Sequence, residues 1–331
     1  EARADALGVE YAHNIGDALL PQWRVGKDVR RLAGILDLCY TEVAFKREGL
    51  HQKPLLYTSL GARLADTQTG GRFAGCMTFM HKPHEYTYLP AAEVQLSAVQ
   101  IAANGGHTWV GSRRIPAPQF EAMAEVNQFL RRHDPWYADT RSAARVALLW
   151  PTYAISFNPR TSLQRGDMEE GVVRSDRGVH GNPSDCFAGA AETLFRSHVP
   201  FDVIDEEGLD PVHGPDRYRV LVLPNVTHLG DEHIQNLRQY VERGGTLVAS
   251  HMTSRYDEFG RPRRGLGLAE VFGVAGDGQE IGPRTLEHVG HGGTAPRHPV
   301  TDFLRAEHLL SGPHRDPWMA CPPYITDTAL A

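Results

Sequence analysis

One segment of the chain, residues 217–274, constrains the fold more than any other. Residues 219–223 form an apolar run that ends at a proline and is too short for a helix, which is typical of a buried strand. Apolar residues then recur at helical spacing until the pair Gly244-Gly245 marks the end of a helix. Residues 246–250 are again apolar and β-branched. The segment therefore predicts a βαβ unit of a parallel sheet that is covered on both faces.

Length and charge narrow the class of protein. A chain of 331 residues is too long for one typical core and suggests two domains. The net charge is −6 and no cluster of Lys and Arg stands out, which argues against a nucleic-acid partner. No apolar run approaches the roughly 18 residues that a membrane span needs, so no membrane association is expected.

The ends of the sequence and its cysteines bear on its context. The chain begins at Glu1 without a Met and stops shortly after residues 322–324, so we expect an internal piece of a longer protein. The cysteines are far apart and form no CxxC pair, which favours free thiols in a reducing compartment such as the cytoplasm. They are Cys39, Cys76, Cys186 and Cys321.

In residues 1–142, strand and helix patterns alternate four times without an antiparallel hairpin signal, which implies parallel βα units. The predicted strands are residues 9–14, 38–45, 73–80 and 107–111, and the predicted helices are residues 28–36, 55–66, 91–103 and 119–133. Four such units make about half of a (β/α)8 barrel, which needs roughly 250 residues. Because half a barrel has open sheet edges, either this is another α/β sheet or further strands lie upstream.

A polar stretch near residues 140–144 predicts a boundary, and a second α/β domain follows over residues 143–275. Its predicted strands are residues 145–150, 201–204, 219–223 and 246–250, and its predicted helices are residues 186–198 and 231–243. A polar insert over residues 158–185 is interpreted either as a surface loop or as a loop that reaches the barrel or a neighbouring subunit. Residues 276–331 are rich in Gly, Pro and His and are expected to be an irregular continuation.

The second domain has a sequence pattern that resembles one family closely, namely GGTLVAS…YDEFG…GL…FGV. It is similar to the middle, class I amidotransferase-like domain of family 42 β-galactosidases and related glycoside hydrolases, which is called the β-galactosidase trimerisation domain. In those proteins a catalytic TIM barrel precedes this domain. The resemblance therefore implies that residues 1–142 are the C-terminal half of a (β/α)8 barrel and that residues 143–275 form a flavodoxin-like, doubly wound domain.

The resemblance also implies a function. The full protein is expected to hydrolyse O-glycosidic bonds by carboxylate acid/base catalysis, as a β-galactosidase- or α-L-fucosidase-like enzyme that needs no cofactor, and this piece alone to be inactive. The second domain would be non-catalytic and would join copies into a homo-oligomer, a trimer or a dimer. The nucleophile signature of the family's β-galactosidases is not found in the first 142 residues, which leaves sugar, linkage and stereochemistry open.

Glu42 is the predicted catalytic residue. Side chains at the C-terminal ends of barrel strands face the active site, and Glu42 lies near such an end. A glycosidase needs two carboxylates that flank the scissile bond. The second is expected on upstream strands or at Glu10, Glu48 or Glu85. The structural alternative is an ion pair between Glu42 and the adjacent Lys46 or Arg47.

Further side chains at the ends of the predicted strands could contact a sugar. After the third strand, residues 81–86 contain His, Lys, Glu and Tyr, whose polar groups match sugar hydroxyls. A His-x-x-His pair could instead bind a metal, but no third ligand is evident, so no metal is predicted. Trp109 could stack on a sugar ring or belong to the core. The predicted substrate contacts are His13, Asn14, His81, His84, Tyr86, Trp109 and Arg113.

Two other classes of function remain open. If the barrel has lost one of the two catalytic carboxylates, the protein would be a non-enzymatic carbohydrate-binding or assembly protein. A cysteine hydrolase would need a nucleophile at a strand-to-helix elbow, but the strand at residues 246–250 is followed by His251 rather than Cys. Cys186 lies on another element, so the second domain is expected to be catalytically silent.

Overall fold

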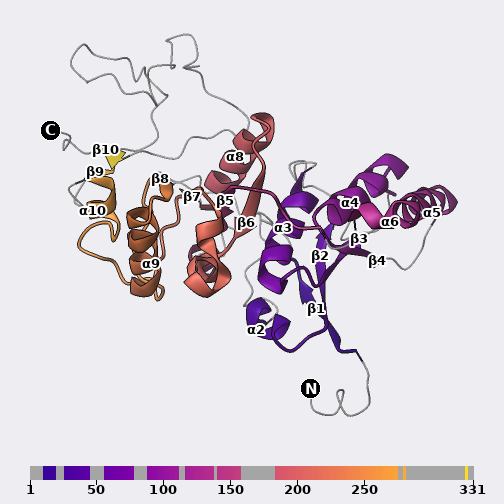
Figure 1. Cartoon of the computed structure of the whole chain (residues 1–331), viewed down its shortest axis with the longest axis horizontal. Coiled ribbons are helices and arrows are strands. Elements are labelled where there is room, and N and C mark those ends of the chain that lie inside the picture. Colours follow the sequence, from indigo (N-terminus) through magenta and orange to yellow (C-terminus); the bar gives the residue numbers. More distant parts are fainter. Residues whose placement is uncertain are drawn as a thin grey trace, which may run out of the picture.

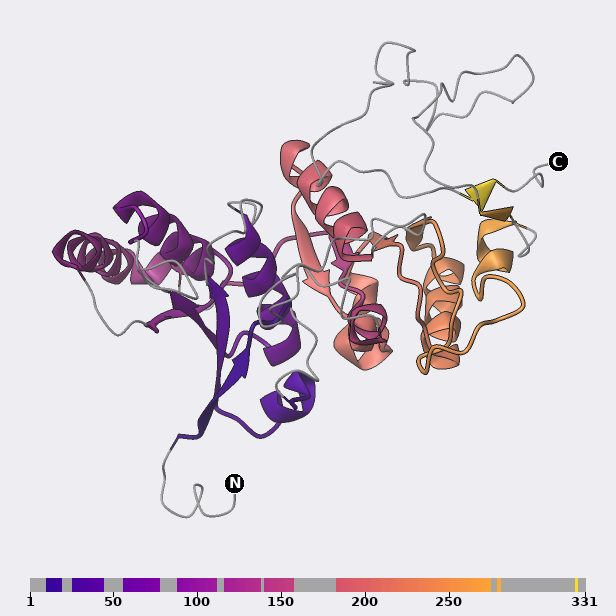
Figure 2. The same ribbon diagram turned by 180° about the vertical axis from the view of Figure 1, so that it is seen from behind.

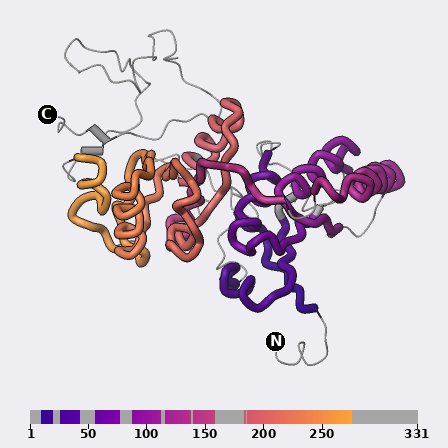
Figure 3. Tube along the Cα trace, viewed as in Figure 1, coloured from indigo at the N-terminus to yellow at the C-terminus, as the bar shows by residue number. Residues whose placement is uncertain are grey.

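The computed structural model places the chain in two lobes, as Figure 1 shows. It describes residues 10–19, 26–44, 56–77, 88–111, 116–137, 140–157 and 183–274, together with the backbone of residues 279–280 and 325–326. Figure 3 follows the chain from the first lobe, in indigo to magenta, into the second lobe, in pink to orange. Each lobe is built on a four-stranded parallel sheet.

The first sheet has the strand order β1-β2-β3-β4, and all neighbours are parallel. Its strands are β1 (Ala12–Gly16), β2 (Leu38–Ala44), β3 (Phe73–Met77) and β4 (His107–Val110). Its helices are α2 (Val29–Ala33), α3 (Tyr57–Thr69), α4 (Ala91–Ala103), α5 (Ala117–Arg132) and α6 (Asp134–Tyr137). The predicted alternation of strand and helix is confirmed. Because right-handed crossovers that advance in one direction place their helices on one face, no described helix covers the other face.

Apolar spacing and one glycine explain how the helices meet this sheet. Val94, Ala98 and Ile101 recur on one side of α4 and are buried against the sheet. A Cβ atom at Gly75 of β3 would lie 2.6 Å from Cδ1 of Ile101. Only glycine therefore lets α4 approach β3 this closely, since protein interiors leave no room for an added methyl group.

The second sheet has the order β6-β5-β7-β8, again with all strands parallel. Its strands are β5 (Val146–Leu149), β6 (Phe201–Ile204), β7 (Val220–Pro224) and β8 (Thr246–Ser250). Its helices are α7 (Thr152–Phe157), α8 (Pro183–Arg196), α9 (Asp231–Glu242) and α10 (Ala269–Phe272), with short 3-10 turns at η3 (Glu206–Leu209), η4 (Pro211–His213) and η5 (Pro215–Arg217). This reversing order is that of a doubly wound fold, as predicted.

Two apolar clusters show that both faces of the second sheet are covered. Leu148 and Val203 point to the face that α8 covers, where Phe187 and Ala191 are buried. The other face packs against α9, and its cluster includes Ala147, Leu149, Leu221, Leu223, Ile234 and Leu237. The short helix α7 was not predicted from the sequence, and most of the predicted insert lies outside the described residues. A separate pair, β9 (Gln279–Glu280) and β10 (Ile325–Thr326), is antiparallel.

Helix α3 joins the two lobes, as the rear view in Figure 2 also shows. Strand β6 is an edge strand, and α3 lies along its outer side. Thr67 Oγ1 of α3 donates to the carbonyl of Val203 at 2.6 Å, and Arg63 donates to the carbonyl of Phe201. Side chains of α3 thus bond edge carbonyls that another strand would otherwise pair with.

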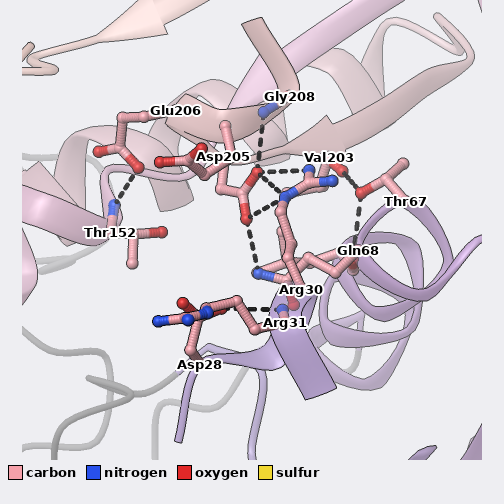
Figure 4. Close-up of polar contacts among 12 residues, drawn as sticks. Asp28, Arg30, Arg31, Thr67, Gln68, Thr152, Val203, Asp205, Glu206 and Gly208 are labelled. Atoms are coloured by element: carbon pink, nitrogen blue, oxygen red, sulfur yellow. Dashed lines mark hydrogen bonds and ion pairs between the residues drawn. The ribbon is translucent and has the colours of Figure 1, made fainter. Parts of the chain in front are cut away.

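Asp205, directly after β6, fixes the same seam (Figure 4). Its buried carboxylate accepts from Arg30 of α2 at 2.9 Å (Nε) and 2.5 Å (Nη2) and from Gln68 of α3 at 2.8 Å. It also accepts from the backbone N–H of Gly208 at 3.1 Å, within its own lobe. Two lobes therefore share one carboxylate, and we call this group of four residues the Asp205 seam.

No helix among the described residues is long and apolar enough to cross a membrane.

Candidate functional site

The face of the first sheet away from its helices carries several polar and aromatic side chains. Parallel neighbours in register point to the same face, and successive residues point to opposite faces. Cys39 and Phe73 are paired and buried under the helices, so Tyr40 and Glu42 lie on the other face. Cys76 and Trp109 are likewise paired on that face. In a closed barrel this face lines the interior, and we call it the lumen face.

Glu42 is hydrogen-bonded to Asn14 of the neighbouring strand. Asn14 Nδ2 donates to Glu42 Oε1 at 2.9 Å, and Asn14 Oδ1 accepts from the backbone N–H of Gly16 at 2.7 Å. Both side chains are half-buried. The register of β1 against β2 shifts between Asn14 and Gly16, so the end of β1 contains a bulge. Such bulges occur next to active sites, where they re-aim a side chain.

Two aromatic rings lie beside this pair on the lumen face. The ring centroids of Tyr40 and Trp109 are 5.3 Å apart, with planes inclined by 43°. Trp109 is half-buried, and its Nε1–H is buried without a hydrogen-bond partner in the described part of the chain. Aromatic faces of this kind pack against the apolar faces of ligands. Tyr40 was not predicted, although its position two residues before Glu42 in one strand places it on the same face.

A second carboxylate at this end of the sheet was also missed from the sequence. Asp17 directly follows β1 and is buried, and Tyr57 at the start of α3 donates its hydroxyl to Asp17 Oδ2 at 2.8 Å. Asp17 Oδ1 accepts from the backbone N–H of Leu19 at 3.0 Å. Because both oxygens are engaged within the fold, Asp17 holds the strand end to α3. The signal in the sequence was its place three residues after the predicted strand at residues 9–14.

The remaining predicted contacts are distributed differently. His13 pairs with Cys39, so it points to the helix side of the sheet, away from Asn14 and Glu42. Glu10 is exposed ahead of β1. The other predicted residues lie outside the described part of the chain, namely Lys46, Arg47, Glu48, His81, His84, Glu85, Tyr86 and Arg113. The described residues contain no group of three or more His, Cys, Asp or Glu side chains that could hold a metal ion.

The end of the second sheet has an elbow without a thiol. His251 follows β8 with φ of 50°, a left-handed conformation that is uncommon outside glycine, and its Nδ1 lies 3.0 Å from Asn225 Oδ1. Asn225 follows β7 with φ of 53°. The cysteines of the described residues are buried elsewhere, at Cys39, Cys76 and Cys186. The elbow therefore presents an imidazole where a cysteine hydrolase would present its nucleophile.

Two titratable groups of the second lobe have shifted pKa values for structural reasons. Burial raises the pKa of Glu206 to about 8, although its carboxylate accepts from the backbone N–H groups of Thr152 and Tyr153. Burial also lowers the pKa of His228 to about 4, where its ring stacks between Phe157 and Tyr256. Neither group lies on the lumen face. The burial and contacts of Glu206 and His228 within the second lobe account for both pKa shifts.

Comparisons with known proteins show which folds this chain resembles. Residues 192–283 match the sequence model of a family described as the β-galactosidase trimerisation domain. This range begins within α8 and contains β6, β7, α9, β8 and α10. No curated protein sequence matches the chain.

Several solved structures share the fold at low sequence identity. A GH42 β-galactosidase from G. stearothermophilus is 20% identical, with a TM-score of 0.61, and the match covers 86% of this chain and 43% of that one. The β-galactosidase from Rahnella sp. R3 is 18% identical, with a TM-score of 0.63 over 86% of this chain and 43% of its own. The β-galactosidase from Halorubrum lacusprofundi is 14% identical, with a TM-score of 0.60 over 83% and 43%.

The chain thus spans less than half the length of these solved relatives. The similarity extends over both lobes in each case. The predicted resemblance is confirmed at the level of fold. The chain has the fold of the C-terminal half of a (β/α)8 barrel followed by a doubly wound domain, and residues 192–283 match the β-galactosidase trimerisation domain model.

Proposed function

We propose that the full protein is a glycoside hydrolase and that Glu42 is one of its two catalytic carboxylates. The observation that carries the proposal is the position of Glu42 at the C-terminal end of β2, on the lumen face, beside Asn14 and the aromatic pair Tyr40 and Trp109. Barrel enzymes place their reacting groups at this end of the strands. A carboxylate can supply one of the two groups that cleave a sugar acetal, and aromatic rings beside it can pack on the apolar face of the sugar.

The proposed mechanism is acid/base hydrolysis at an anomeric carbon. One carboxyl group protonates the leaving oxygen, and the other acts as nucleophile or as base toward water. Glu42 supplies one of these groups, and the second comes from a barrel strand outside the described residues. A separation of about 5–5.5 Å between the two would give retention, and about 6.5–9.5 Å would give inversion. Of the predicted substrate contacts, Trp109 lies on the face where the sugar would bind, and Asn14 lies on the same face hydrogen-bonded to Glu42. No cofactor enters these steps.

The test is Glu42→Gln in the full-length protein, assayed against p-nitrophenyl β-D-galactopyranoside and p-nitrophenyl α-L-fucopyranoside. We expect kcat to fall by at least about 1,000-fold, because the amide can neither donate a proton nor attack. Glu125→Gln is the matched control, since Glu125 is an exposed helix carboxylate that accepts from Gln95 at 3.0 Å. Unchanged turnover in Glu42→Gln would exclude Glu42. Sugar binding without any hydrolysis by the wild type would instead indicate a carbohydrate-binding protein.

The second lobe is proposed to join copies of the protein into a homo-oligomer, a trimer or a dimer. Support comes from the description of the family that matches residues 192–283. The catalytically silent elbow at His251 is consistent with a structural role. Light scattering coupled to gel filtration of the full-length protein gives the test, and a monomer at micromolar concentration would contradict the proposal.

A further inference from the structure

The amide group of Asn14 has a fixed orientation. The backbone N–H of Gly16 can only donate, so the Asn14 atom 2.7 Å away must be the acceptor Oδ1. The atom that faces Glu42 Oε1 at 2.9 Å is therefore the NH2 group, which can only donate. Exchange of the two amide atoms would place donor against donor at Gly16. The pair thus has one hydrogen-bonding arrangement rather than two.

The local backbone supports this arrangement from the opposite face. Gly16 has φ of 74°, a backbone conformation that favours glycine. It lies just after the register shift and forms the last pair of β1 with β2. The hydroxyl of Thr41, which is buried under the helices, donates to the carbonyl of Gly16 at 2.9 Å. Gly16 is therefore held by its N–H through Asn14 on the lumen face and by its carbonyl through Thr41 on the helix face.

We infer that Asn14 is a positioning residue for Glu42 rather than a ligand of the substrate. This inference rests on the proposed function of Glu42. Each polar atom of the Asn14 side chain makes one hydrogen bond within the protein, and together these two bonds fix the side chain between Gly16 and Glu42. Its NH2 group holds Glu42 Oε1, and no described residue hydrogen-bonds Oε2. Asn14 thus fixes one of the two Glu42 oxygens and with it the orientation of the carboxyl group, which is what preorganised catalytic groups require.

The test compares Asn14→Ala and Asn14→Asp in the full-length protein, with steady-state kinetics on p-nitrophenyl glycosides across the pH range. For Asn14→Ala we expect kcat to fall about 10- to 100-fold, because a misplaced catalytic group loses its near-attack geometry. KM should change less than about 3-fold, since no substrate contact is removed. Asn14→Asp places a second carboxylate against Glu42, so the limb of the pH–rate profile that Glu42 controls should move to higher pH.

Thr41→Val is the matched control because it removes the other hydrogen bond to Gly16 and leaves the lumen face intact. We expect it to lower Tm about as much as Asn14→Ala while kcat stays unchanged. An equal loss of kcat in both variants would overturn the inference, because the effect would then come from the bulge. A rise in KM at constant kcat in Asn14→Ala, or an unmoved pH profile in Asn14→Asp, would overturn it as well. The proposed function fails separately if Glu42→Gln retains turnover.

Discussion

The two parallel sheets of this protein have the same number of strands but use their polar residues in opposite ways. The first advances in the order β1-β2-β3-β4, so its helices cover one face and leave the other open for Asn14 and Glu42. The second reverses at β5, in the order β6-β5-β7-β8, so helices cover both faces. Its buried acids Asp205 and Glu206 are engaged with the protein itself. Strand order thus decides which sheet has helices of its own lobe on both faces and which has them on one.

The strongest test of this contrast is Asp205→Ala. The substitution leaves the Arg30 guanidinium, whose side chain is 14% exposed, without its carboxylate, and it removes the acceptor of Gln68 and Gly208. Loss of one partner from a buried ion pair costs about 3–5 kcal/mol. We therefore expect the free energy of unfolding, measured by urea denaturation, to fall by that amount.

Asp216→Ala is the matched control, because Asp216 forms an exposed ion pair with Arg243 at 2.9 Å. Exposed pairs contribute about 0–1 kcal/mol. If both variants lost the same small amount of stability, the Asp205 seam would be no more than a surface contact. That result would contradict the view that the buried acids of the second sheet stabilise the fold.

The two regions also differ in how far the sequence predicts them. Apolar periodicity predicted both parallel sheets, and the place of Glu42 near the end of a predicted strand made it the candidate, because these signals are local. His13 was grouped with Asn14 because both lie at the end of the predicted strand, although adjacent strand residues point to opposite faces. The bulge between Asn14 and Gly16 left no signal in the sequence. The Asp205 seam joins residues 137 and 175 positions apart, and no local pattern encodes such contacts.

Gly75→Ala tests the covered face of the first sheet. The added Cβ would lie 2.6 Å from Cδ1 of Ile101, so α4 must move or Ile101 must adopt a strained rotamer. Overpacking of this kind costs about 1–3 kcal/mol, which thermal unfolding should report as a lower Tm. The double variant Gly75→Ala/Ile101→Val should lose less than the sum of the single variants, because Val lacks the nearest methyl group. Additive losses would show that α4 yields without contact between the two residues.

Glu206→Gln tests whether the buried carboxyl group of Glu206 lowers the free energy of unfolding at neutral pH. The pKa of Glu206 is about 8 in the folded state against 4.5 ordinarily, so between these values the unfolded chain releases a proton that the folded one keeps. Stability should therefore fall as pH rises from about 4.5 to 8, by at most about 1.4 kcal/mol per pH unit, and stay level outside that window. Urea unfolding of Glu206→Gln across this range should show a smaller decline. Glu207→Gln, at an exposed neighbouring position, should keep the wild-type slope.

Thr67→Val should have the smallest effect, and it tests whether α3 serves the second sheet as well as the first. The Thr67 hydroxyl donates to the edge carbonyl of Val203 at 2.6 Å and to its own helix at Leu64 at 3.0 Å. Removal leaves the edge carbonyl without this donor, so we expect a loss of about 1 kcal/mol by urea denaturation. In the control Thr193→Val, an exposed hydroxyl that bonds only within α8 is removed, and stability should barely change. If Thr193→Val loses as much stability as Thr67→Val, the hydrogen bond from α3 to the edge carbonyl adds no stability of its own. Helix α3 would then cover the edge of β6 by apolar packing alone.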